Sequence, residues 1–443
     1  MANTLIERAL VPDATRSRLL VVAGDVPGLP RWTLEDPEPV DTVRVARSAS
    51  GITSPFLRTV RSDWAPDKAE SHSLNEFDAL PAQWVCPAGL EWLDFDAAGT
   101  IDAGPFGADV GQWIADLRSG TTAAARSTWA RPGWFEATAT WLIDVLRGLG
   151  RTPTGPIEQL GSWAVSSRLA VDTDVGRVIV KSVPGLFGYE PRLTQALAFE
   201  HPGRVPEVLA IDPQHGHLVM AAFGGTELGY EEPSRWAEGL VEMARIQQAW
   251  IGRGEEAALF GVEDRSLAVL GSELESIITD ERAAPELDPA TRGRLVANLP
   301  RYHDIIGELE AGPVPATLVH GDLHPWNVQR DGDRLVIFDW SDSCWSHPFL
   351  DVATFTVRTE DISARHAMRR AYLDAWAGWA DPSSLHEHLR SAELLMEFHV
   401  AISWRRLTAI FEPGAHAFAE RGVHRHLEMA LAATDALDQP ATG

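Results

Sequence analysis

One segment, residues 320–327 (HGDLHPWN), constrains this chain more than any other. Asp322 and Asn327 fall within it, and Asp339 follows after a turn at residues 331–333 and a short apolar run. This order predicts a loop–strand–turn–strand unit with its polar side chains at one end. Phosphoryl transfer needs a base that orients the attacking hydroxyl and oxygen ligands for Mg²⁺. The spacing therefore favours phosphoryl-transfer chemistry.

Two plainer interpretations of the same residues are open. Asp beside Gly is common in turns, and Asn327 taken alone could cap a helix. His320 and His324 with Asp322 could also be zinc ligands. The chain has no His-Glu-x-x-His or Cys-x-x-Cys spacing that would supply further ligands. The combined pattern is better explained by a kinase-type loop.

The segment resembles the catalytic loop of the aminoglycoside phosphotransferase family and its relatives, the choline and homoserine kinases. These families share a bilobal architecture with the protein kinases. The resemblance implies that Asp322 is the catalytic base and that Asn327 and Asp339 bind magnesium. Trp340 follows Asp339, as expected for the small-molecule branch and not for protein kinases.

Two further residues of the motif are implied to support the loop. His320 matches the residue that braces it, and Asp351 matches a family carboxylate that steadies it from behind. Asp351 could equally cap the N-terminus of a helix, and the two roles are compatible.

A nucleotide-binding small lobe is expected upstream. Residues 157–160 and 167–171 are predicted strands around a turn at 161–163, and 177–183 is a third strand. Lys181 resembles the strand lysine that contacts nucleotide phosphates, and Glu190, at the start of the next helix, is its natural partner. The alternative is a surface lysine on an edge strand and a glutamate favoured by the helix dipole.

The phosphate-covering turn has neither Gly-x-Gly-x-x-Gly nor a Walker-type loop. Its N–H groups and hydroxyls, including those of Ser166 and Ser167, could contact phosphate oxygens. By resemblance, the backbone from Met220 to Ala222 would bind adenine, although an ordinary interior strand would look the same.

A helical large lobe should follow, with helices at 236–250, 289–311, 362–379 and 385–411. Acceptor specificity in the family resides among such helices. Candidate lining residues, each of which could instead be purely structural, are Glu393, Glu397, His399, Trp404 and Arg405.

The N-terminal region differs from the rest. Strands are predicted at 17–23, 56–60 and 82–86, with a short helix at 41–49. The order faintly resembles a Nudix domain, but Ser48 and Ala49 stand where paired acids are expected, which implies a scaffold or recognition module. A run of small residues at 119–124 suggests a boundary, and a helix follows at 134–149.

The amino-acid composition limits the classes of partner that the protein can bind. The net charge of −25 argues against a nucleic-acid partner, whose phosphates require clustered Lys and Arg. The same charge permits steering of a cationic acceptor, although solubility explains it equally well.

The cellular compartment of the protein is inferred from further features of the sequence. The only two cysteines, Cys86 and Cys344, cannot form a disulfide framework, which suggests a reducing cytosol. No early signal peptide is recognisable, because charged residues and proline interrupt any apolar run, and no segment is long enough to span a membrane. We therefore expect a cytoplasmic protein.

The expected fold class is α+β: a bilobal protein-kinase-like domain over residues 130–443, with small lobe 130–223 and large lobe 224–443. A small α+β domain of unclear role precedes it at 1–125. The expected reaction is Mg²⁺-dependent transfer of the γ-phosphoryl group of ATP to a hydroxyl of an aminoglycoside, amino sugar, sugar or amino alcohol. The acceptor, the choice between ATP and GTP, and the oligomeric state do not follow from the sequence.

Two alternatives belong to other classes. A nucleotide-binding pseudokinase-like regulator would act through the N-terminal domain, but the chemical positions Lys181, Asp322, Asn327 and Asp339 are all intact. A metal-dependent hydrolase built on the N-terminal domain would need a carboxylate cluster, which that region lacks.

Overall fold

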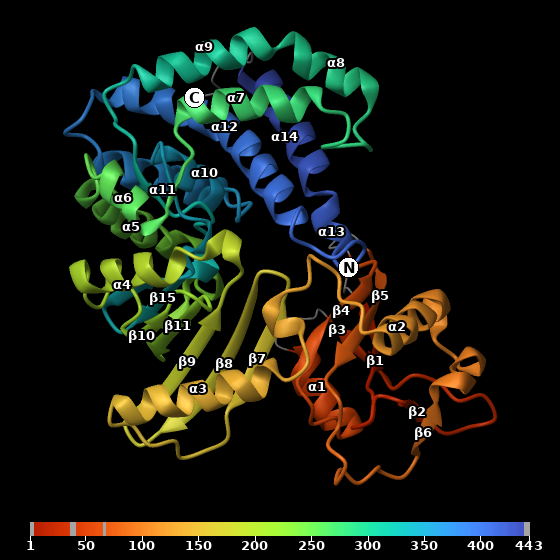
Figure 1. The fold of residues 1–443 in the computed structure, drawn as a ribbon. Helices are drawn as coiled ribbons and strands as arrows, with labels where there is room; N and C mark the ends of the chain where they lie inside the picture. Colours follow the sequence, from red (N-terminus) through yellow and green to blue (C-terminus); the bar gives the residue numbers. More distant parts are fainter. Residues whose placement is uncertain (1–3, 36–40, 65–67, 438–443) are drawn as a thin grey trace. The chain divides into compact units, whose positions relative to one another are not determined.

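The computed structural model describes residues 4–35, 41–64 and 68–437. It divides into two compact units (Figure 1). The first comprises Met1–Pro184 together with Leu407–Glu420, and the second comprises Gly185–Arg406 together with Arg421–Gly443. The expected division near residues 125–130 stays a prediction.

A four-stranded sheet of order β3-β1-β5-β4 begins the first unit. Its strands are β1 (Thr4–Leu10), β3 (Arg31–Glu35), β4 (Phe56–Ser62) and β5 (Glu70–Phe77). β1 and β5 run parallel, and the other neighbours are antiparallel. In β3, buried and exposed side chains alternate, as expected for a sheet with one covered face.

The remaining elements of this region are β2 (Arg18–Val22), which pairs with β6 (Leu90–Asp94), and helices α1 (Asp41–Ser50) and α2 (Gly107–Ser119). The predicted strands at 17–23 and 56–60 and the helix at 41–49 are confirmed. The predicted strand at 82–86 is wrong. Trp84 N–H donates to Pro81 O at 2.8 Å, which closes a turn, and Pro87 cannot donate to a strand ladder.

Next come α3 (Trp134–Gly148) and an antiparallel meander of β7 (Glu158–Trp163), β8 (Ser166–Thr173) and β9 (Gly176–Ser182). The predicted helix at 134–149 and the third strand are confirmed. The turn lies at residues 164–165 and not at 161–163. Residues 161–163 pair with β8 after an irregularity in β7, which carries the strand beyond its expected end.

The segment Leu407–Glu420 belongs to the first unit although it lies between the last long helices of the second. Glu412 accepts two hydrogen bonds from Arg126, at 2.7 and 3.1 Å, and lies 3.3 Å from Arg58 Nη1. Ser62 N–H donates to Gly414 O at 3.0 Å. These contacts attach the segment to the N-terminal sheet.

The second unit begins with α4 (Glu190–Glu200) and an antiparallel hairpin of β10 (Val208–Asp212) and β11 (His217–Ala221). Helices make up most of the remainder, and Figure 1 shows α7, α8 and α9 running near one another. They are α5 (Ala237–Ala249), α6 (Gly254–Phe260), α7 (Leu267–Thr279), α8 (Pro289–Ala297), α9 (Leu299–Glu310), α10 (Phe349–Thr356), α11 (Ile362–Ala375), α12 (Pro382–Thr408), α13 (Ala417–Glu420, in the first unit) and α14 (Gly422–Leu437).

The helix expected at 289–311 is two helices. α8 ends at Ala297 with Asn298 as its C-cap, and Pro300 lies in the first turn of α9, where its missing N–H costs nothing. The helices expected at 236–250, 362–379 and 385–411 are present as α5, α11 and α12, with ends that differ by a few residues.

Two small sheets complete the second unit. One contains β12 (Thr226–Glu227), β15 (Val328–Asp331) and β16 (Arg334–Ile337), and the other contains β13 (Glu263–Asp264), β14 (Thr317–Val319) and β17 (Cys344–Ser346). Within the described ranges, no helix combines the length and the apolar content needed to cross a bilayer.

Candidate functional site

The β15–β16 hairpin brings the motif residues of the second unit together. Val328 faces Ile337 across the ladder, so the residues just outside this pair lie side by side. Phe338 N–H donates to Asn327 O at 3.0 Å. The loop that carries Asp322 and Asn327 is therefore bonded directly to the segment that carries Asp339.

Within the loop, the amide of Asn327 is held by backbone. Its Nδ2 donates to Asp322 O at 3.0 Å, which leaves Oδ1 as the atom suited to a cation. The Asp322 carboxylate is about half exposed, at 46%, and lies 3.7 Å from His324 Nε2. Burial lowers the pKa of His324 to about 4, so this imidazole is neutral at pH 7 and adds no positive charge beside Asp322.

His320 and Asp351 hold the loop from behind. The N–H groups of His320 and Gly321 donate to the two oxygens of Asp351, at 2.9 and 3.0 Å, and Gln247 Nε2 donates a third bond at 2.9 Å. His320 Nε2 lies 3.0 Å from Phe338 O. Asp351 stands inside the first turn of α10, whose N-cap is Pro348, so its carboxylate serves a distant loop and not its own helix end.

The buried position of Asp351 shifts its titration. Burial raises the pKa of this carboxyl to about 7, although the N–H groups of His320 and Gly321 and the Gln247 amide oppose the shift. The protonation state of Asp351 therefore changes near neutral pH.

Backbone geometry requires glycine at position 321. Gly321 has φ +83°, and a Cβ there would collide with the backbone of Asp342. The loop that carries Asp322 and the segment after Asp339 consequently approach more closely than any side chain at position 321 would permit. Asp339 itself adopts φ 67° and ψ 62°, a left-handed conformation that costs a non-glycine residue about 1–2 kcal/mol. Its Oδ1 accepts a hydrogen bond from Ser341 Oγ at 2.7 Å.

The donor set fits magnesium. Asn327 and Asp339 offer an amide and a carboxylate oxygen, and Mg²⁺ commonly binds through one or two such groups with water and nucleotide phosphates. Among the residues that the structure describes, no cluster of three or more His, Cys, Asp or Glu side chains could hold a metal.

The predicted nucleotide-side residues lie in both units. Lys181, Ser166 and Ser167 belong to the first unit, in β9 and β8, while Glu190 begins α4 in the second. Lys181 and Glu190 are both buried, with exposed fractions of 6% and 1%. The Ser167 hydroxyl lies 2.5 Å from Ser162 Oγ, so it is engaged within the hairpin.

The two predicted adenine contacts belong to the second unit. Met220 pairs with Val208 in the β10–β11 hairpin. Ala222, just past β11, lines a cavity of about 570 Å³ that α4, the hairpin and β16 also border.

The residues predicted to line the acceptor site each pair with or pack against other residues of the second unit. Glu393 pairs with Arg369 at 2.6 Å, and Glu397 lies 2.7 Å from His426 Nδ1. His399 is fully buried, and burial holds its pKa well below the ordinary value. The remaining two candidates pack against neighbours: Arg405 donates to Ser276, and the ring of Trp404 lies against Gly422.

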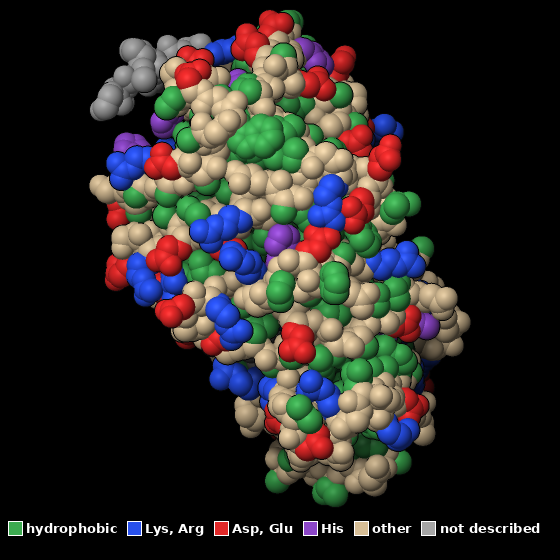
Figure 2. Space-filling view, turned by 90° about the vertical axis from the view of Figure 1, so that its left-hand side faces the viewer, with side chains coloured by type: hydrophobic (Ala, Val, Ile, Leu, Met, Phe, Trp, Pro, Cys, Tyr) green, Lys and Arg blue, Asp and Glu red, His purple; other side chains and the backbone are tan. Residues whose placement is uncertain are grey.

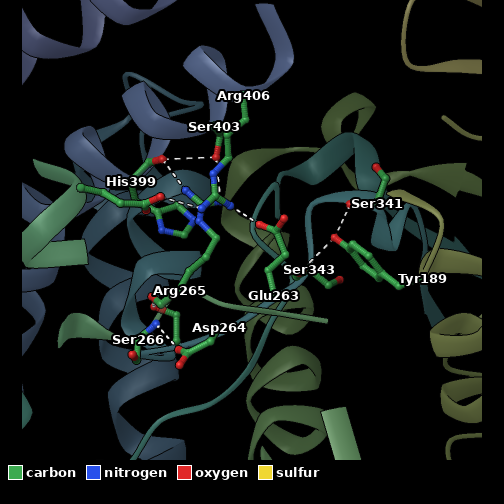
Figure 3. A network of polar contacts seen from close by, with 12 residues as sticks. Tyr189, Glu263, Asp264, Arg265, Ser266, Ser341, Ser343, His399, Ser403 and Arg406 are labelled. Carbon is green, nitrogen blue, oxygen red and sulfur yellow. Dashed lines mark hydrogen bonds and ion pairs between the residues drawn. The ribbon is translucent and has the colours of Figure 1, made fainter. Parts of the chain in front are cut away.

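Figure 3 shows two groups of polar contacts, one at the segment that follows Asp339 and one that joins Arg265 to α12. Tyr189 OH contacts Ser341 O and Ser343 O, at 2.5 and 2.8 Å. Further along, the Arg265 guanidinium donates to Ser403 Oγ and His399 O, at 2.9 and 2.8 Å. Sequence reasoning missed Tyr189, because its hydroxyl meets backbone carbonyls more than 150 positions away and belongs to no local pattern.

The surface shown in Figure 2 carries charged side chains of both signs. Acidic and basic side chains are interspersed over the face shown in Figure 2. On that face the excess of acidic residues is not gathered into one field that would attract a cation.

A family model confirms the class of protein. Residues 156–386, more than half of the chain, match the model described as the phosphotransferase enzyme family (APH). The chain therefore belongs to this family, whose members are small-molecule kinases that act on hydroxyl groups. No curated protein sequence matches the chain.

Solved structures support the fold. A choline kinase from Cryptosporidium parvum Iowa II is 11% identical, with a TM-score of 0.50, and the alignment covers 67% of this chain and 96% of that one. At this identity the likeness shows the fold alone, and it confirms the predicted α+β, protein-kinase-like class.

Two other similar structures come from bacteria. A choline/ethanolamine kinase family protein from Mesorhizobium loti is 18% identical (TM-score 0.48; 68% of this chain, 99% of that chain). A macrolide 2'-phosphotransferase from Brachybacterium faecium is 19% identical (TM-score 0.46; 64% and 97%).

Proposed function

We propose that this enzyme transfers the γ-phosphoryl group of ATP, as its magnesium complex, to a hydroxyl of a small polar molecule. The acceptor classes that fit are aminoglycosides, amino sugars, sugars and amino alcohols. The observation that carries the proposal is the bond from Phe338 N–H to Asn327 O, which joins the Asp322 loop to the Asp339 segment. The proposed base and the two proposed magnesium ligands then lie on two segments that are hydrogen-bonded to each other, as phosphoryl transfer requires of groups that act together.

Each residue has a defined task in this proposal. Asp322 accepts the proton of the attacking hydroxyl, and its half-exposed carboxylate is open to an acceptor. Asn327 and Asp339 would hold Mg²⁺, which neutralises charge on the phosphates when bound. His320 and Asp351 fix the loop that presents the base, through the bonds to the His320 and Gly321 N–H groups.

On the nucleotide side, Lys181 would neutralise phosphate charge, and Glu190 would orient it. Ser166 and Ser167 would contribute hydroxyls and N–H groups to the phosphates. Met220 and Ala222 would contribute backbone groups to the adenine.

The test is Asp322→Asn in the full-length protein, assayed against a panel of choline, glucosamine, an aminoglycoside and a macrolide. Wild type should add one phosphoryl group to at least one acceptor, detected by mass. The variant should still bind Mg·ATP, while its turnover falls about 10²–10⁴-fold.

Asp333→Asn provides the matched control. Asp333 is exposed in the turn between β15 and β16, at the end of the same hairpin that is opposite the Asp322 loop. Turnover of this control should stay at the wild-type level. Undiminished turnover in Asp322→Asn would eliminate Asp322 as the base.

A further inference from the structure

We propose that Tyr189 is a positioning residue that locks the start of α4 to the magnesium-binding segment, an inference that rests on the function proposed above. Tyr189 immediately precedes Glu190, the first residue of α4. Its hydroxyl reaches two carbonyl oxygens of the segment after Asp339, those of Ser341 at 2.5 Å and Ser343 at 2.8 Å (Figure 3). One side chain therefore joins the helix of the predicted lysine partner to the segment of the predicted metal ligand.

The contact reaches Asp339 in one further step. Ser341, whose carbonyl Tyr189 holds, donates its own hydroxyl to Asp339 Oδ1 at 2.7 Å. Displacing the Ser341 backbone would move the hydroxyl that orients this carboxylate. Asp339 already adopts a left-handed conformation, which persists only where the surroundings hold it in place.

The contact is buried. Tyr189 is 8% exposed, and Ser341 and Ser343 are 9% and 1% exposed, so water has little access to replace the phenol. Burial raises the pKa of Tyr189 well above its ordinary value, which keeps the hydroxyl protonated and able to donate. Removing the hydroxyl would leave buried carbonyls without this donor.

The rest of the segment that follows Asp339 is held by contacts that do not involve Tyr189. Arg265 N–H donates to Trp345 O at 3.0 Å, Ser346 Oγ donates to Arg265 O at 2.6 Å, and the Arg265 guanidinium is bonded to α12. β17 is therefore held against β13 and α12 without Tyr189. Loss of the phenol hydroxyl should release the Asp339 end of the segment from α4 and leave its far end in place.

The experiment measures metal binding directly, with Mn²⁺ in place of Mg²⁺ and ADP as the nucleotide. Free Mn²⁺ is quantified by electron paramagnetic resonance in full-length wild type and Tyr189→Phe. The variant should bind Mn²⁺ in the ADP complex about three- to ten-fold more weakly, the range for loss of one buried hydrogen bond. Its metal-free affinity for ADP should stay at the wild-type value.

Tyr302→Phe is the matched control. Tyr302 is likewise buried, and its hydroxyl lies 3.0 Å from Thr434 Oγ1, between α9 and α14. Its Mn²⁺ affinity should equal that of wild type. Equal weakening in both variants, or none in Tyr189→Phe, would overturn the proposal.

Ser341→Ala is a second route to the same test if Tyr189→Phe does not fold. It removes the hydroxyl on Asp339 and keeps both carbonyls, so it should weaken Mn²⁺ binding by a similar factor; unchanged binding overturns the proposal. A wild-type protein that binds no Mn·ADP would instead refute the proposed function, and this inference with it.

Discussion

Gln159 in β7 holds the backbone of Phe56 in β4 with both ends of its side-chain amide. Phe56 N–H donates to Oε1 at 2.8 Å, and Nε2 donates to Phe56 O at 2.9 Å. The side-chain amide thereby forms with Phe56 the pair of hydrogen bonds that the backbone of a neighbouring strand would form. Within the first unit, this contact ties the N-terminal sheet to the hairpin that carries Ser166 and Ser167.

Replacing Gln159 should destabilise the protein. Gln159→Ala leaves a buried N–H and a buried carbonyl of Phe56 without these partners, at about 1–3 kcal/mol each. The free energy of unfolding measured in urea should fall by about 2–6 kcal/mol. The exposed Gln112, bonded only to Asp116 on the same helix, is the control, and Gln112→Ala should change stability by less than about 0.5 kcal/mol. Equal effects in the two variants would contradict this role.

Trp129 should affect nucleotide affinity. Its indole N–H donates to Trp163 O at 2.8 Å, and Ser127 Oγ donates to Ala164 O at 3.1 Å, so both bonds hold the turn between β7 and β8. Because this turn is the predicted phosphate cover, Trp129→Phe should raise the Kd for Mg·ATP about two- to ten-fold in calorimetry.

Trp113→Phe separates this effect from simple loss of ring volume. Trp113 is equally buried, but its indole N–H has no hydrogen-bond partner among the described residues. Its Kd should match that of wild type. A Kd for Trp129→Phe no higher than that of this control would refute the role of the indole N–H.

We expect glycine to be required for the stability of the fold at position 321 but not at position 332. Both have positive φ, +83° and +61°, but only at Gly321 would a Cβ meet another part of the chain, the backbone of Asp342. Gly321→Ala should lower the free energy of unfolding by more than about 3 kcal/mol, and Gly332→Ala by about 1–2 kcal/mol. Thermal and urea unfolding would measure both. Similar losses would show that backbone strain alone, and not the close approach, requires Gly321.

Asp351 should make stability depend on pH. Its pKa is about 7 in the folded protein, above its ordinary value of 3.8, so the folded state binds the proton more tightly than the unfolded chain does. This contribution is complete at low pH and is lost as pH rises, by about 2 kcal/mol between pH 5 and pH 7. In Asp351→Asn, the free energy of unfolding measured in urea should lose this dependence on pH. The substitution can also shift the free energy of unfolding by the same amount at every pH, which does not affect the test. Parallel pH profiles in the two proteins would show that Asp351 does not titrate in this range.

The sequence alone predicted the class of chemistry and most of the local elements. Asp322, Asn327 and Asp339 could be singled out because their spacing is a property of one short stretch of chain. Helices such as α3 follow from apolar residues that recur every turn, and strands such as β9 from β-branched runs. Even the break between α8 and α9 had a local signal in Pro300, which the periodicity of the apolar residues obscured.

Only the tertiary structure decided which buried polar groups meet. Gln159 reaches Phe56 across 103 positions, Tyr189 reaches Ser341 across 152, and the segment around Glu412 joins Arg126 across 286. The chain around these residues has no repeat or motif that would reveal such partners. A buried donor must find an acceptor, but which acceptor it meets is set by the packing of distant elements and not by its neighbours in sequence.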